Sequence, residues 1–144
     1  MDSAIETCAE RRIVLTESWD NQHAIIEAGK FAERAGFSKT EQAMISTAAS
    51  ELSTNIIRYA CKGELFLRIV RDKNRIGIEM VAIDKGPGID SISKAMEDHY
   101  TTTKGSLGLG LPSVRRIMDD FEIESSPKEG TRIAARKWRV DGKN

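Results

Sequence analysis

The chain has 144 residues, and its 22 basic and 22 acidic side chains cancel to a formal net charge of zero. This length suits one domain with a single hydrophobic core, and an apolar share of 40 % excludes intrinsic disorder. A balanced charge provides no cationic field that would gather nucleic acid or an anionic membrane surface. We therefore expect one domain over residues 1–144, with no nucleic-acid or membrane partner.

The chain offers few residues for disulfide or metal chemistry. Cys8 and Cys61 are too few for a disulfide framework and lack the spacing of a zinc or redox motif. With only His23 and His99 present, a histidine-rich metal site or a histidine triad is not expected. The N-terminus is acidic where a signal peptide is basic, and no apolar run is long enough to span a membrane. We expect a cytoplasmic protein with structural cysteines, Cys61 being buried.

The first elements of the chain are a strand and two helices. Apolar and β-branched residues over 11–17 predict a strand. Asp20 is a candidate N-cap for a first helix that ends at Gly36. Ser38 and Glu41 have the spacing of a capping box, and the apolar stripe that follows continues for several turns. This second helix is the clearest prediction of the pattern.

The second half of the chain alternates strands, a glycine-dense stretch and helices. Strand patterns at 64–71 and 75–83 flank a short polar turn, which predicts an antiparallel hairpin. The remaining predicted elements are a short helix at 91–98, a helix at 111–120, and strands at 121–126 and 131–140. Hairpins interrupted by helices are typical of an α+β fold. We expect a two-layer α/β sandwich in which helices cover one face of a mixed, mainly antiparallel sheet.

Glu51 and Asn55 form the first candidate site. They are four residues apart on the second helix, and so are neighbours on one face at the border of its apolar stripe. Such a pair alone is typical of a solvated helix edge. In a functional interpretation, Asn55 offers an oxygen to a hard cation while Glu51 accepts a proton from an attacking hydroxyl.

The second candidate is the D-x-G-x-G pattern formed by Asp84, Gly86 and Gly88 after a predicted strand. A carboxylate at a strand end is held on a rigid element and accepts hydrogen bonds from amino groups such as the exocyclic amine of adenine. Glycines beyond it permit close approach of the backbone to a flat ligand. A plain turn explains this pattern equally well when it stands alone.

The third candidate is the glycine-rich run that contains Gly105, Gly108 and Gly110 and opens into a predicted helix. Backbone N–H groups and the helix dipole at such a position favour phosphate. The run is neither a Rossmann fingerprint nor a P-loop, because no strand leads directly into it and Leu111-Pro112 follows it. The alternative is a flexible loop without a ligand.

Taken in order, these motifs and the final Gly130-Thr131 pair resemble the GHKL ATPase/kinase superfamily over nearly the whole chain. The chain is too short for the additional domains of the larger members. The phrases at 51–56 and 108–112 are most similar to the RsbT serine/threonine switch kinases of the bacterial stressosome. The resemblance implies the Bergerat ATP-binding fold, with ATP and Mg²⁺ as cofactors.

The same resemblance implies a role for each candidate residue. Glu51 would be the general base, Asn55 would ligate Mg²⁺, and Asp84 would bind the adenine amine. Thr131 would support the adenine contact, and Lys94 and Lys104 are candidate phosphate contacts. The glycines that would shape the base pocket and line the triphosphate are Gly86, Gly88, Gly105, Gly108 and Gly110.

The function implied by this family is an ATP- and Mg²⁺-dependent protein serine/threonine kinase in a bacterial partner-switching stress response. Its substrates would be STAS-domain proteins, and a PP2C-type phosphatase would be the downstream partner that it activates. One alternative is an anti-sigma-factor kinase that also binds a sigma factor, and another is a nucleotide-gated binding module without phosphate transfer. We further expect the segment 89–110 to be a lid that becomes ordered with nucleotide.

Overall fold

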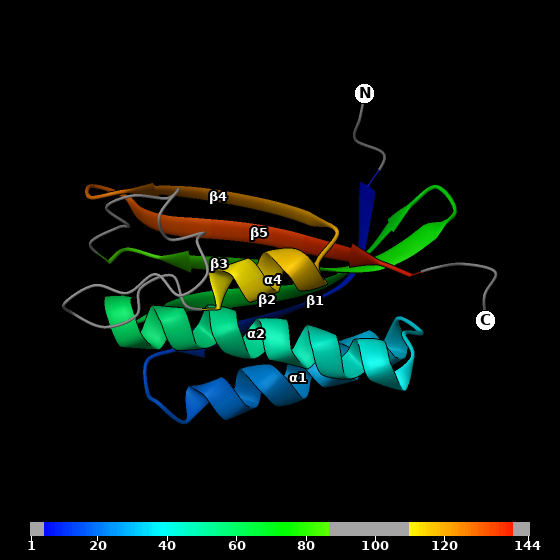
Figure 1. Cartoon of the computed structure of the whole chain (residues 1–144), viewed down its shortest axis with the longest axis horizontal. Helices are drawn as coiled ribbons and strands as arrows, with labels where there is room; N and C mark the ends of the chain where they lie inside the picture. Colours follow the sequence, from blue (N-terminus) through cyan, green and yellow to red (C-terminus); the bar gives the residue numbers. More distant parts are fainter. Residues whose placement is uncertain (1–4, 87–109, 140–144) are drawn as a thin grey trace.

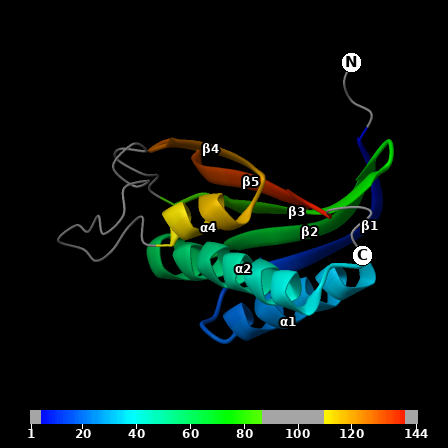
Figure 2. The same ribbon diagram turned by 45° about the vertical axis from the view of Figure 1, so that its right-hand side comes forward.

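The computed structural model describes residues 5–86 and 110–139. Within these ranges the elements are β1 (Ile5–Leu15), α1 (Asp20–Arg34), α2 (Lys39–Ala60), β2 (Gly63–Asp72), β3 (Arg75–Asp84), α4 (Leu111–Ile117), β4 (Asp120–Ser126) and β5 (Gly130–Trp138). All three helices lie on the same face of the sheet, with α1 and α2 side by side and α4 next to α2 (Figures 1 and 2). The expected two-layer α+β architecture is confirmed.

The five strands form one sheet in the order β1-β2-β3-β5-β4. Each neighbouring pair in the described part is antiparallel, so the expectation of a mixed sheet is wrong there. The two helices between β1 and β2 return the chain to the end at which β1 finished, and Leu15 pairs with Gly63. Strands β2 and β3 form the expected antiparallel hairpin, but Asp72 is paired with Arg75 and belongs to β2, where the sequence predicted it in the turn. Strand β1 begins at Ile5, earlier than the predicted start at residue 11. The prediction missed the first residues because β1 is an edge strand, and these residues are exposed and do not alternate apolar with polar side chains.

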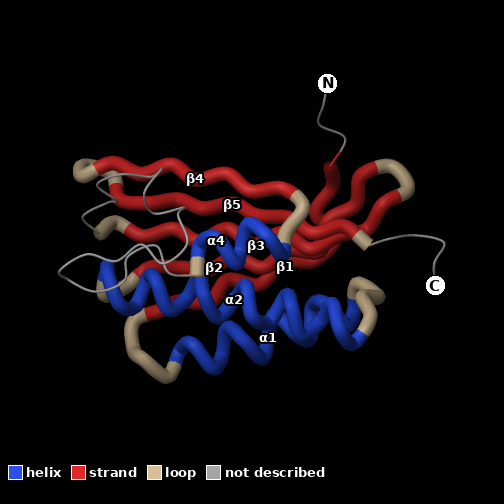
Figure 3. Tube along the Cα trace, in the orientation of Figure 1, coloured by secondary structure: helices blue, strands red, loops and turns tan. Residues whose placement is uncertain are grey.

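The hydrophobic core lies between the sheet and the two long helices, which form the separate layers of Figure 3. Alternate residues of β2 and β3 point toward the helices and are fully buried, among them Leu65, Leu67, Ile78 and Met80. Small side chains on the helices, such as Ala28 and Ala48, are also fully buried. Their size permits close approach of the layers. No helix within the described ranges is long and apolar enough to cross a membrane.

The ends of the helices test the capping predictions. The predicted capping box is present: the Ser38 hydroxyl accepts the Glu41 N–H at 3.1 Å, and the Glu41 carboxylate accepts the Ser38 N–H at 3.2 Å. The prediction for Asp20 is wrong, because Trp19 is the N-cap residue of α1. The Asp20 carboxylate instead accepts the N–H groups of Thr16 and Glu17, each at 2.9 Å. These bonds lower the pKa of Asp20 and close the turn between β1 and α1.

The expectation that Cys61 is buried is also wrong. Cys61 directly follows the last residue of α2, has a positive φ of 72°, and is exposed. The chain reverses here to enter β2, so the side chain leaves the helix stripe that would have taken it into the core. Cys8 is exposed as well.

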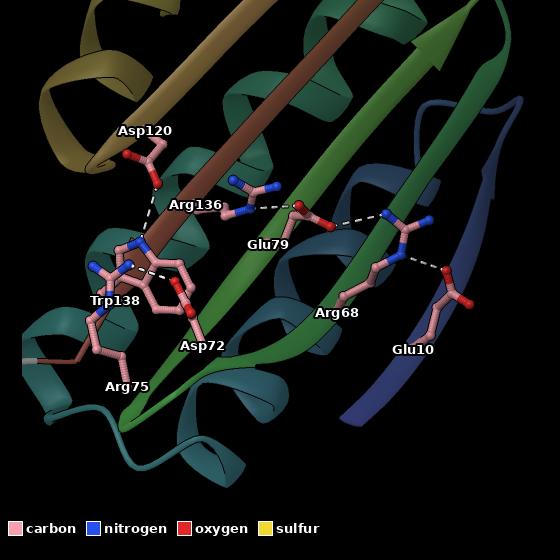
Figure 4. A network of polar contacts seen from close by, with 8 residues as sticks. All are labelled: Glu10, Arg68, Asp72, Arg75, Glu79, Asp120, Arg136 and Trp138. Carbon is pink, nitrogen blue, oxygen red and sulfur yellow. Dashed lines mark hydrogen bonds and ion pairs between the residues drawn. The ribbon is translucent and has the colours of Figure 1, made fainter. Parts of the chain in front are cut away.

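The face of the sheet that no described helix covers carries a row of ion pairs across four strands (Figure 4). Arg68 bonds Glu10 at 2.7 Å and Glu79 at 3.0 Å, and Arg136 bonds the other oxygen of Glu79 at 2.7 Å. The Glu79 side chain is only 10 % exposed, because the long arginine side chains lie over it. We call Glu10, Arg68, Glu79 and Arg136 the charge ladder.

Candidate active site

Asp84 ends β3 and is held there by the sheet on both sides. It pairs in register with Gly63 of β2 and with Thr131 of β5. Its Oδ1 accepts the N–H of Gly86 at 2.8 Å. Burial raises the pKa of the Asp84 carboxyl, and the hydrogen bonds from the backbone of Gly86 and Thr131 act in the opposite direction. A partly desolvated carboxylate on a rigid strand end is well suited to accept a hydrogen bond from a ligand.

Glycine is required at two positions next to Asp84. Gly130 has a φ of +85°, and a Cβ there would meet the Asp84 carbonyl oxygen and lie 2.6 Å from the Cα of Lys85. A Cβ on Gly86 would lie 2.6 Å from the Cβ of Ala60, at the end of α2. These close approaches bring the ends of β3, β5 and α2 together. The predicted role of Gly86 in shaping a pocket is compatible with this packing.

An open hollow of about 690 Å³ is lined by Asp84 and Thr131 and by neighbouring residues of β3, β4, β5 and the turn between β4 and β5, but by no described residue of α2. The pairing of β3 with β5 places these two predicted residues, Asp84 and Thr131, side by side. The other residues that line this hollow include Ile83, Lys85, Glu124, Ser125, Lys128 and Arg132.

Ser125 is a residue of this hollow that the sequence analysis did not identify. It pairs with Thr131 in the register of β4 and β5, and the two hydroxyl oxygens are 2.8 Å apart. Ser125 therefore helps to fix the orientation of the Thr131 hydroxyl. Only the pairing of β4 with β5 reveals this role of Ser125, because no local sequence motif contains both Ser125 and Thr131.

Glu51 and Asn55 lie in the second half of α2, and both are partly buried rather than fully solvated. The Glu51 carboxylate packs directly against Gly110 at the start of α4: a Cβ built on Gly110 would clash with Glu51 Oε1 and lie 2.7 Å from Cδ. The structure therefore places two predicted site residues, Glu51 and Gly110, in contact. This contact was not predicted.

A polar contact from α1 supports the same segment of α2 from the other side. The Asn21 amide nitrogen donates to the Thr54 hydroxyl at 2.7 Å, and the Ser50 hydroxyl donates to the Asn21 carbonyl oxygen at 3.4 Å. Ser50 and Thr54 directly precede Glu51 and Asn55. We call this contact the Asn21 bridge.

The two parts of the site are joined by α2. Ala60 packs against Gly86 beside Asp84, and Glu51 lies nine residues earlier in the same helix. At 1.5 Å per residue this spans roughly 13 Å along the helix axis. An elongated ligand with one end at Asp84 would extend along α2 toward Glu51.

The donor set suits a magnesium ion that is bound together with phosphate. The described part of the chain holds no group of three His, Cys, Asp or Glu residues that could bind a metal alone. Asn55 supplies an amide oxygen, and Mg²⁺ usually takes one or two protein oxygens together with substrate phosphates and water. Asn55 therefore fits a shared site rather than a complete protein cage.

Several predicted features lie outside the described residues. They are Gly88, Lys94, Lys104, Gly105, Gly108, the helix at 91–98, and the part of the expected lid that precedes Gly110. Their predicted roles stay predictions.

Comparison with known proteins defines the class of this site. Residues 21–137 match the model of the histidine kinase-like ATPase domain, so the chain belongs to this family of ATP-binding domains. It is 45 % identical over 125 residues to the serine/threonine-protein kinase RsbT of Bacillus subtilis (strain 168), covering 87 % of this chain and 92 % of that protein. The chain is accordingly a protein serine/threonine kinase of the RsbT type, as the motifs indicated.

The chain is also similar to anti-sigma F factors. It is 33 % identical over 129 residues to that of Caldanaerobacter subterraneus subsp. tengcongensis, covering 86 % of this chain and 89 % of the relative. It is 32 % identical over 129 residues to that of Thermoanaerobacter sp. (strain X514), with the same coverage. The family therefore contains both kinases and anti-sigma factors.

Proposed function

We propose that the chain transfers the γ-phosphoryl group of ATP to a serine or threonine of a STAS-domain protein and then changes partner to activate a PP2C-type phosphatase. The observation that carries the kinase part is that α2 joins two carboxylates: Glu51 lies on this helix, and Ala60 at its end packs against Gly86, two residues after Asp84 of β3. Both residues are partly buried, and the nine residues from Glu51 to Ala60 span roughly 13 Å along the helix axis, which would suit an elongated ligand such as a nucleotide.

Each residue has a separate role in this proposal. Asp84 accepts a hydrogen bond from the adenine amine, and Thr131, oriented by Ser125, supports it from β5. Asn55 supplies an oxygen to Mg²⁺, and Glu51 accepts the proton of the attacking hydroxyl. When bound, ATP with Mg²⁺ supplies the phosphoryl group and neutralises its developing charge.

The partner classes rest on the relatives. A kinase and anti-sigma factors share this fold at 45 % and 33 % identity, which supports a chain that exchanges protein partners. The higher identity to RsbT favours the STAS substrate and phosphatase partner over a sigma factor. The similarity to anti-sigma F factors supports sigma-factor binding as a second candidate function, which a pull-down with sigma factors tests.

The direct test is incubation of the chain with labelled ATP, Mg²⁺ and a panel of STAS domains, for the wild type and for Glu51→Gln. Glutamine keeps the size of the side chain and removes the base, so transfer should fall by about 10²–10⁴-fold. ATP affinity, measured by calorimetry, should stay near that of the wild type. The matched control is Glu33→Gln on the exposed surface of α1, which should transfer at the full rate.

Two outcomes would contradict the proposal. A full-rate Glu51→Gln variant would show that Glu51 is not the base. If the wild type binds ATP but labels no STAS domain, the proposed substrate class is wrong.

A further inference from the structure

The contact between Glu51 and Gly110 leaves no space for a side chain at position 110. Gly110 has a φ of +91° and is the N-cap residue of α4. A Cβ there would meet Glu51 Oε1 and lie 2.7 Å from Cδ and 3.2 Å from Cβ of the same side chain. The whole end of Glu51 therefore lies over the Cα of Gly110.

Helix α4 is held in place by buried residues and hydrogen bonds, so the backbone at Gly110 cannot easily move away from Glu51. Leu111 and Val114 are 1 % and 0 % exposed, and the Val114 N–H bonds the Gly110 carbonyl at 2.9 Å. At the other end, the Lys137 ammonium donates to the Ile117 carbonyl at 3.0 Å. A side chain at position 110 would displace Glu51 rather than α4.

We propose that Gly110 is a positioning residue for the general base, because its missing side chain creates the place that the Glu51 carboxylate occupies. The inference rests on the proposed role of Glu51 and adds a function for Gly110 that is separate from phosphate contact. A carboxylate must lie within hydrogen-bond reach of the hydroxyl that it deprotonates. Displacing a catalytic group by about 1 Å can cost 10²-fold in rate.

The test is Gly110→Ala in the full chain, with the STAS domain that the wild type phosphorylates best as substrate. We expect kcat to fall by about 10- to 100-fold, while KM for ATP and the calorimetric Kd stay within a few-fold of the wild type. Gly36→Ala is the matched control, since Gly36 also has a positive φ, of +93°, but meets the flexible end of Arg139. It should lose stability from backbone strain and keep its kcat.

A second variant guards against loss of folding. Gly110→Asn also introduces a Cβ, and asparagine tolerates positive φ better than alanine does. It should reproduce the low kcat with a smaller loss of thermal stability. Full kcat in both variants would overturn the proposal.

The decisive measurement combines Gly110→Ala with Glu51→Gln. If Gly110 acts through Glu51, the double variant should be no slower than Glu51→Gln alone, because effects within one unit do not add. A further loss equal to that of Gly110→Ala alone would overturn the proposal, as would weaker ATP binding with unchanged kcat, which would assign Gly110 to the phosphates. A full-rate Glu51→Gln variant would instead overturn the proposed base and this inference with it.

Discussion

The helix-covered face and the uncovered face of the sheet hold their charged groups in different ways. On the uncovered face, Glu79 has both oxygens paired with arginines, Arg68 and Arg136, across the charge ladder. On the covered face, Asp84 relies on backbone N–H groups, and burial raises the pKa of its carboxyl. In the charge ladder each carboxylate is paired with an arginine, whereas the Asp84 carboxylate lies in an environment that disfavours its ionised form. This is the pattern expected where binding is maintained at a cost in stability.

Of the substitutions that test the difference between the two faces, Asp84→Asn should have the largest effect, a loss of ATP affinity. The amide keeps an oxygen for the Gly86 N–H but loses the charge that strengthens a bond to the adenine amine. A lost charge-assisted hydrogen bond costs about 1.5–3 kcal/mol, so ATP should bind roughly tenfold to hundredfold more weakly by calorimetry. Unchanged affinity would remove Asp84 from the adenine site.

The same variant tests whether ionisation of Asp84 reduces the stability of the folded protein. Because the folded-state pKa of Asp84 is raised from 3.8, the folded protein holds this proton more tightly than the unfolded chain does. Deprotonation therefore reduces stability as the pH rises from the unfolded pKa through the folded one. Without nucleotide at neutral pH, Asp84→Asn should unfold at the same temperature as the wild type or higher. A lower temperature would show that the ionised form is favoured by folding.

Glu79→Gln tests the ladder with a smaller effect. The substitution leaves two arginines without their shared carboxylate, but their side chains are 27 % and 34 % exposed, so water takes up part of the loss. We expect urea unfolding to show a loss of about 1–2 kcal/mol, with ATP affinity unchanged. Glu64→Gln is the control, because its partner Arg12 is 56 % exposed and such pairs contribute about 0–1 kcal/mol. Equal losses in both variants would remove the distinction between the ladder and a surface pair.

The contrast also explains what sequence alone could and could not predict. The capping box of Ser38 and Glu41 and the strand-end position of Asp84 were predicted correctly, because their signals lie within a few residues. The ladder and the contact of Glu51 with Gly110 join residues far apart in the chain, so they depend on strand register and helix packing. Asp20 was misassigned because an aspartate at the start of a helix can either cap the helix or accept hydrogen bonds from the preceding turn. The local sequence does not distinguish these two roles.

The smallest predicted effect concerns the Asn21 bridge between α1 and α2, in which, as in the charge ladder, the polar groups bond one another. Asn21→Ala removes a hydrogen bond of 2.7 Å to Thr54 and a longer one of 3.4 Å from Ser50. Both hydroxyls can turn to water or to helix carbonyls, so urea unfolding should show a loss of about 1 kcal/mol. A double-mutant cycle with Thr54→Val isolates the bond, and Gln22→Ala on the exposed surface of α1 controls for helix propensity.

Phosphoryl transfer by Asn21→Ala should stay within a few-fold of the wild type, because Glu51 packs against Gly110 of α4, whereas Asn21 bonds Ser50 and Thr54. A fall in kcat comparable to that expected for Gly110→Ala, with little loss of stability, would show instead that α1 sets the position of the base. The two variants together therefore decide which neighbour of α2 orients Glu51.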